Sequence, residues 1–187
     1  EPLIAEAEAN GNRIVISGLW SGIFGDSYRM IGFDQFLLGM AAIPDVIHTL
    51  VDRMTEMYLE LNDRLFSQLR GRIDVWFFGN DFGSQQALLF SAAMWDDFFG
   101  ENIRRLCELA HSYGLRVMMH SCGCVAPLLD RLLDAGVDIL DPVQTSAAGL
   151  EPKPLMRAYA DRLIFHGGID AQHVLPTATV EEAAAHA

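Results

Sequence analysis

"LRVMMHS", residues 115–121, is an almost continuous apolar run that ends in a histidine and a serine. A strand with one wet face would alternate apolar and polar residues, whereas this run is typical of a strand covered on both faces. The sequence therefore predicts a buried strand of a parallel sheet. Four more runs have the same β-rich character: "RIVISGLW" (13–20), "IDVWFFG" (73–79), "VDILDPV" (137–143) and "RLIFHGG" (162–168).

Helical patterns lie between these runs. Residues 45–70 carry an apolar residue every three or four positions, which predicts a helix opened by Pro44. Residues 91–113 predict another helix, with Ser91 as its N-cap. The apolar stripe of the first helix consists of Val46, Leu50, Met54, Met57, Leu61, Leu65 and Leu69. Shorter helices are expected over 125–135 and 151–160.

The alternation of strands and helices restricts the architecture to two parallel folds. Right-handed crossovers lead either to an open doubly wound sheet or to part of a (β/α)8 barrel. No glycine-rich phosphate-binding motif follows any strand, which speaks against the first. A barrel gathers the carboxyl ends of its strands on one face, and polar residues cluster at those ends. The clusters are 26–29, 80–86, 120–124, 141–144 and 166–170.

Composition excludes some partners and points to a compartment. The net charge of −12 disfavours nucleic acid and anionic membranes as partners. Three cysteines are too few for a disulfide framework and fit a reducing, cytoplasmic setting, and we find neither a signal peptide nor a spanning segment. The chain begins without methionine and stops within a helix that opens at Thr179. We therefore expect residues 1–187 to be a single domain truncated at both ends.

Four blocks of the sequence resemble the uroporphyrinogen decarboxylase superfamily: "FFGNDFGSQQALLFSAAMWDDFF" (77–99), "HSCG" (120–123), "GVDILDPVQTSAAGLEP" (136–152) and "FHGGIDAQHVLPTATVEE" (165–182). The resemblance implies a (β/α)8 TIM barrel, of which the five strands here would be the third to the seventh. Such a partial barrel has open edges, and we expect it to be a homo-oligomer or poorly soluble in isolation.

Within that superfamily the chain is more similar to the branch of corrinoid and coenzyme M methyltransferases than to the true decarboxylase. The decarboxylase has a Gly-x-Pro-Trp-Thr segment after its third strand and a Lys-Gly pair after its fifth. This chain has "GLWSGIFGDSYRMIGF" (18–33) and "HSCG" (120–123) there. The resemblance implies that a His-x-Cys pair on the fifth strand binds zinc, with a third cysteine on the eighth strand and outside this chain. It also implies a corrinoid as methyl carrier.

The pair in question is His120 and Cys122. Residues i and i+2 of a strand point the same way, so both side chains can face one cavity. Imidazole and thiolate are good zinc ligands, and zinc lowers the pKa of a thiol bound to it. The alternative is a hydrogen-bonded histidine beside a small apolar cysteine at an ordinary strand end. Gly123 should turn Cys124 away from the pair, and Cys107 is expected to lie in the core.

Further polar residues are candidates for catalysis or substrate binding. Asp81 and, by the resemblance, Tyr28 are candidate catalytic residues. The structural alternative is a helix-capping loop for the cluster that contains Asp81 (Asn80, Asp81, Ser84 and Gln85), and a surface loop for the cluster that contains Tyr28 (Asp26, Tyr28 and Arg29). The candidate substrate contacts are Trp20, Asp26, Arg29, Asn80, Gln85, Gln144, His166 and Asp170.

Three functions stay open at this point. The first is zinc-assisted methyl transfer on a small-molecule substrate, with a corrinoid protein as partner or a thiol as acceptor. The second is metal-free decarboxylation of uroporphyrinogen III in porphyrin biosynthesis. The third is an inactive paralogue or a module that binds a corrinoid protein. Stoichiometric zinc would separate the first from the second, and turnover would separate it from the third.

Overall fold

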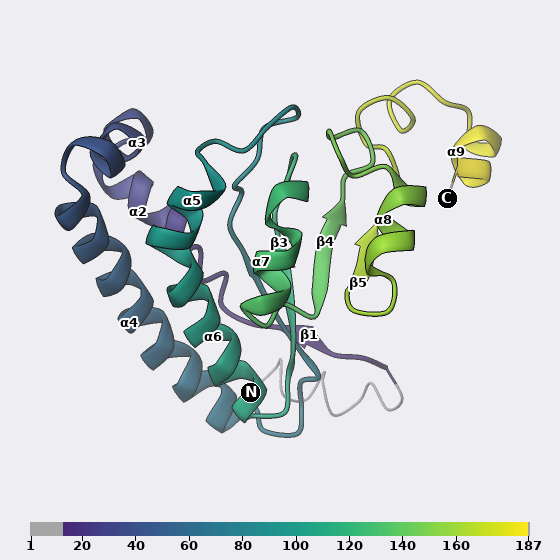
Figure 1. The fold of residues 1–187 in the computed structure, drawn as a ribbon. Coiled ribbons are helices and arrows are strands. Elements are labelled where there is room, and N and C mark those ends of the chain that lie inside the picture. Colours follow the sequence, from purple (N-terminus) through teal and green to yellow (C-terminus); the bar gives the residue numbers. More distant parts are fainter. Residues whose placement is uncertain (1–12, 187) are drawn as a thin grey trace.

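The computed structural model describes residues 13–186, which form one parallel sheet with helices packed against it (Figure 1). The strands are β1 (Ile16–Ser17), β2 (Val75–Gly79), β3 (Arg116–His120), β4 (Ile139–Val143) and β5 (Ile164–Gly167). They lie side by side in chain order, and each pairs in parallel with the next. All five fall within the predicted runs, and the predicted parallel α/β fold is confirmed.

Ten helical segments lie between or after the strands of the described range. They are α2 (Ile23–Ile31), α3 (Phe33–Ala42), α4 (Pro44–Gln68), α5 (Ala92–Trp95), a π-helical turn (Asp96–Gly100), α6 (Glu101–Ser112), a 3-10 turn (Ala126–Leu128), α7 (Leu129–Asp134), α8 (Pro152–Tyr159) and α9 (Val180–His186). Ser91 caps α5 as predicted, because its Oγ accepts from the Met94 N–H at 3.1 Å. The sequence did not predict α2 and α3. Within residues 13–186 no helix has the length and apolar character needed to cross a membrane.

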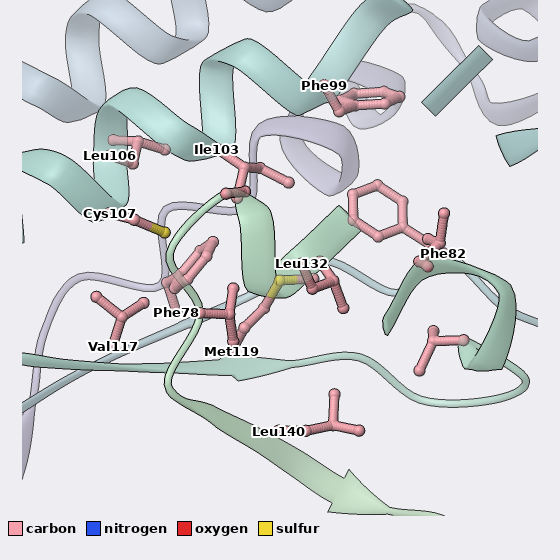
Figure 2. Close-up of a cluster of buried hydrophobic side chains, with 14 of the residues drawn as sticks. Phe78, Phe82, Phe99, Ile103, Leu106, Cys107, Val117, Met119, Leu132 and Leu140 are labelled. Carbon is pink, nitrogen blue, oxygen red and sulfur yellow. The ribbon is translucent and has the colours of Figure 1, made fainter. Parts of the chain in front are cut away.

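The main core lies between the sheet and the helices α6 and α7. Figure 2 shows Phe78, Met119 and Leu140 of the strands among side chains of these helices, such as Ile103 and Leu132. Successive strand residues point to opposite faces, so the residues after Met119 and Leu140 face away from this core. Those residues are His120 and Asp141, which are register partners. The polar side chains of His120 and Asp141 therefore lie on the face of the sheet opposite the main core.

The long helix α4 packs with a different face from the predicted stripe. Three members of that stripe, Val46, Met57 and Leu61, are exposed, whereas the other four are partly buried against the core. The fully buried face consists of Ile47, Val51, Thr55, Asn62 and Phe66. The polar residues on this face have hydrogen-bond partners for their donors: Thr55 Oγ1 donates to the Val51 carbonyl, and Asn62 Nδ2 lies within hydrogen-bond distance of the Tyr58 carbonyl and of Ser21 Oγ. A prediction from the spacing of apolar residues alone does not identify a buried face that includes polar residues.

Candidate metal centre at the strand ends

Three potential metal ligands meet where β2 and β3 end. The Nε2 atom of His120 lies 3.4 Å from Cys122 Sγ and 3.5 Å from an Asp81 carboxylate oxygen. One donor atom from each of the three residues lies within 4.8 Å of the other two. Asp81 is exposed, while His120 and Cys122 are half-buried. Asp81 and His120, both predicted site residues, therefore point toward the same end of the sheet.

The pairing of β2 with β3 explains how residues far apart in the sequence meet. Gly79 and His120 are register partners, so Asp81 and Cys122, each two residues further on, emerge beside each other. The Cys122 N–H donates to Asp81 Oδ1 at 2.9 Å, which holds the carboxylate at the pair. This hydrogen bond places Asp81 where a metal ligand from β2 would be needed.

Two of the three separations between ligand atoms have the size that a tetrahedral zinc ion requires, and the third, between the Asp81 carboxylate and Cys122 Sγ, is below 4.8 Å. Bond lengths of about 2.0–2.3 Å at tetrahedral angles separate neighbouring ligand atoms by about 3.3–3.6 Å. The separations of 3.4 and 3.5 Å at His120 Nε2 have this size before any adjustment. Among residues 13–186 this is the single group of three or more such side chains, and Cys124 is not part of it. The family resemblance implied a third ligand on the eighth strand, whereas the geometry offers Asp81 as a third donor.

The surroundings of Cys122 oppose a free thiolate. Burial raises the pKa of the Cys122 thiol, and the nearby carboxylates of Asp81 and Asp141 raise it further. A bound cation would reverse that effect, because it stabilises the thiolate directly. Without a cation, the 3.4 Å contact also fits a thiol that donates to His120. The ordinary strand end of the sequence analysis therefore stays as the alternative.

Hydrogen bonds and close backbone contacts join the loops that follow β2, β3 and β4 around the three ligand residues. Gly123 has a φ of +81°, and a Cβ there would lie 2.5 Å from the carbonyl oxygens of Gly83 and Ser84. Its N–H donates to Gln144 Oε1 at 2.8 Å, and Gln144 Nε2 donates to Gln85 Oε1 at 3.2 Å. Two predicted substrate contacts, Gln85 and Gln144, therefore lie beside the ligands and also tie three loops to one another.

Trp20 lies against the candidate centre with 43% of its surface exposed. Its ring centroid is 5.4 Å from that of His120 and 5.7 Å from that of Phe77. The close approach requires Gly79, because a Cβ at this position would lie 2.3 Å from the indole. The exposed indole provides an apolar surface beside His120 on which a substrate can pack.

Asn80 has the structural role of a helix cap, which the sequence analysis gave as the alternative for the loop that contains it. Its Oδ1 accepts from the Phe24 N–H at 2.8 Å, so the side chain satisfies a free amide at the start of α2. Asn80 is only 2% exposed, and its Nδ2 has no partner in the described part of the chain. Substrate binding by Asn80 stays a prediction.

We expect Asn80→Ala to lower the free energy of unfolding by about 1–3 kcal/mol, because the buried Phe24 amide loses its acceptor. Gln86→Ala removes an exposed amide from the same loop and should change stability by less than about 0.5 kcal/mol. Urea unfolding of the intact protein compares the two. Equal unfolding midpoints would show that the Asn80 cap contributes nothing.

Asp26, Tyr28 and Arg29 lie on α2, where Asp26 accepts from both Arg29 and Tyr58. Tyr28 packs edge-on against Phe24. In the described range, the hydrogen bonds and ring contacts of these three residues involve one another and neighbouring helical residues, not the ligand cluster. Burial and the Asp26 hydrogen bond raise the pKa of Tyr58, a residue that sequence reasoning missed. The proposed roles of the α2 residues stay predictions.

The last two candidates are His166, which lies in β5, and Asp170, which follows that strand. His166 Nδ1 lies 2.6 Å from Asp141 Oδ1, which links it to the neighbourhood of His120. Asp170 Oδ1 accepts from the N–H groups of Gln172 and His173, and these bonds lower the pKa of Asp170. Asp170 therefore shapes the turn after β5, and its contact with a substrate stays a prediction.

These features define a parallel α/β protein with a polar site at the carboxyl ends of its strands, as in barrel enzymes. Residues 4–187 match the uroporphyrinogen decarboxylase (URO-D) family, and the chain belongs to that family. The fold is similar to that of a methyltransferase from Methanosarcina mazei, with a TM-score of 0.62 at 15% sequence identity. The match covers 97% of this chain and 59% of that one. No curated protein sequence matches the chain.

Proposed function

We propose that the protein is a metal-dependent methyltransferase in which Asp81, His120 and Cys122 bind one zinc ion. The supporting observation is the size of the two separations at His120 Nε2, 3.4 and 3.5 Å, which suit tetrahedral coordination. The shared fold with a methyltransferase is compatible with this activity. We further propose a small-molecule substrate, with a corrinoid as methyl carrier.

The zinc ion, when bound, would act as a Lewis acid that lowers the pKa of a thiol acceptor. Three protein ligands leave a fourth position for that thiol. Trp20, beside His120, would pack against the methyl-bearing substrate and exclude water. The links through Gln85 and Gln144 would keep the loops, and with them the ligands, in place.

Metal analysis and turnover of the intact protein test the proposal. We expect about one equivalent of zinc per chain after mild purification. Removal of the zinc with a chelator should abolish methyl transfer from a methylated corrinoid to a thiol, and added zinc should restore it. Retained turnover with less than about one-tenth equivalent of zinc would contradict the proposal.

Membership of the URO-D family favours a second candidate, the metal-free decarboxylation of uroporphyrinogen III. Release of CO2 from this substrate by chelator-treated protein would support that candidate. A third candidate is a module that binds a corrinoid protein without turnover. A stable complex with a corrinoid protein, combined with inactivity in both assays, would support the third.

A further inference from the structure

The Asp141 carboxylate lies between two imidazole rings. Its Oδ2 is 2.8 Å from His120 Nδ1, and its Oδ1 is 2.6 Å from His166 Nδ1. The side chain is only 14% exposed. Asp141 is the register partner of His120, and its carbonyl accepts from the Ser121 N–H at 2.8 Å. Both the backbone and the carboxylate of Asp141 are therefore fixed relative to His120.

The chemistry of this arrangement determines the tautomer of His120. A carboxylate accepts hydrogen bonds and donates none, so Nδ1 of each neutral histidine must carry its proton. The lone pair of His120 then lies on Nε2, the atom that faces Cys122 and Asp81. A ligating histidine is commonly oriented in this way by an outer carboxylate.

We propose that Asp141 is a positioning residue that holds His120 in the Nδ1–H tautomer, with Nε2 directed at the metal. This inference rests on the proposed function. Two hydrogen bonds restrain Asp141 and support the proposal. His120 donates to one carboxylate oxygen and His166 to the other, so a rotation of the carboxylate would break both bonds. A third restraint acts on the ring itself, because Trp20 and Phe77 lie against His120 with centroid separations of 5.4 and 6.2 Å.

Asp141→Asn tests the role with little change in shape. The amide carries an NH2 group in place of one carboxylate oxygen, so in the present geometry at least one of the two histidines loses its acceptor and the two-sided restraint on the group is lost. In the metal-free protein, nitrogen NMR of the imidazoles should show His120 as the Nδ1–H tautomer, and a shift toward Nε2–H in the variant. Calorimetric titration with Co²⁺ or Zn²⁺ should show binding weakened by about 10- to 100-fold.

Asp138→Asn is the matched control. Asp138 immediately precedes β4 and also pairs with a histidine, since its Oδ2 lies 2.8 Å from His111 Nε2. Asp138 precedes the strand and pairs with His111 of α6, whereas Asp141 lies within the strand and pairs with His120 and His166. The Asp138 variant should therefore keep the metal affinity and the His120 tautomer of the original protein. Thermal unfolding of both variants separates lost stability from lost binding.

The outcomes distinguish this inference from the proposed function. If the unsubstituted protein binds no metal, the proposed function fails, and the NMR result alone decides whether Asp141 orients His120. An unchanged tautomer, or an unchanged metal affinity, in Asp141→Asn overturns the inference. If Asp141→Asn does not fold, Asp141→Glu replaces it: the tautomer should persist while the displaced ring binds metal at least about 10-fold more weakly. Unchanged affinity in that variant also overturns the inference.

Discussion

Cys122→Ala in the intact protein is expected to abolish zinc binding and methyl transfer. Cys122 supplies the only sulfur ligand of the three-residue group found in residues 13–186. Loss of a ligand removes a metal bond outright, so the affinity should fall by more than about 100-fold, the upper effect of losing a supporting residue. Metal analysis, calorimetric titration and turnover measure the result.

Cys107→Ala is the control for this substitution. Cys107 lies on α6 within the main core and is fully buried (Figure 2). Burial raises the pKa of its thiol, with smaller contributions from Asp138 and Glu108, so it is a poor metal ligand and a poor nucleophile. Its loss should cost about 1 kcal/mol of stability and leave zinc binding unchanged. Equal zinc contents in the two variants would show that Cys122 is not a metal ligand and that His120 and Cys122 only form the structural end of a strand.

Phe24→Ala is expected to reduce the free energy of unfolding by about 3–5 kcal/mol, the usual range for removal of a buried phenylalanine. The Phe24 ring is 1% exposed. It lies at the centre of an aromatic cluster, with ring centroids 5.1 to 5.6 Å from those of Tyr28, Phe36, Phe82, Phe90 and Phe99. No neighbouring side chain can fill the space of the lost ring without leaving another contact. Urea unfolding of the intact protein gives the difference.

Phe33→Ala provides the comparison. Phe33 opens α3, is 40% exposed and packs edge-on against Tyr28 at 5.2 Å. Because this ring is largely exposed, its removal should lower the free energy of unfolding by about 1 kcal/mol or less. If Phe24→Ala and Phe33→Ala shift the unfolding midpoint equally, the aromatic cluster does not stabilise α2 as the packing indicates.

The strands could be predicted because their signal is local. Runs such as 73–79 and 115–121 are apolar without alternation, and this property belongs to each segment alone. The helix that begins after Ser91 had a local cap signal as well. By contrast, α2 is a short helix that contains Gly25, and its buried Phe24 packs against rings that are distant in the sequence, those of Phe82 and Phe99. Local patterns do not contain that information.

The candidate site divides in the same way. His120 and Cys122 share a strand end, so strand parity was enough to pair them. Asp81 is 41 residues before Cys122, and its place beside the pair depends on the register of β2 with β3. The link from Asp141 to two histidines likewise depends on the order of β3, β4 and β5. A parallel sheet in chain order supplies these relations, which become visible once the strands are paired.

The hydrogen bonds between the loops around the ligands limit where the sequence of this protein can change in length. Backbone hydrogen bonds join Cys124 to Ser84 and Ala148 to Gln85, so an insertion in one of these loops would have to be matched in the others. In the segment after β5, the N–H groups of Val174 and Leu175 donate to the Asp170 carbonyl, and those of Thr177 and Ala178 donate to the Val174 carbonyl, all within one surface turn. Surface segments of this kind accept changes in length and sequence most readily. We therefore expect related proteins with different substrates to differ mainly after β5, while the ligand-bearing loops keep their lengths.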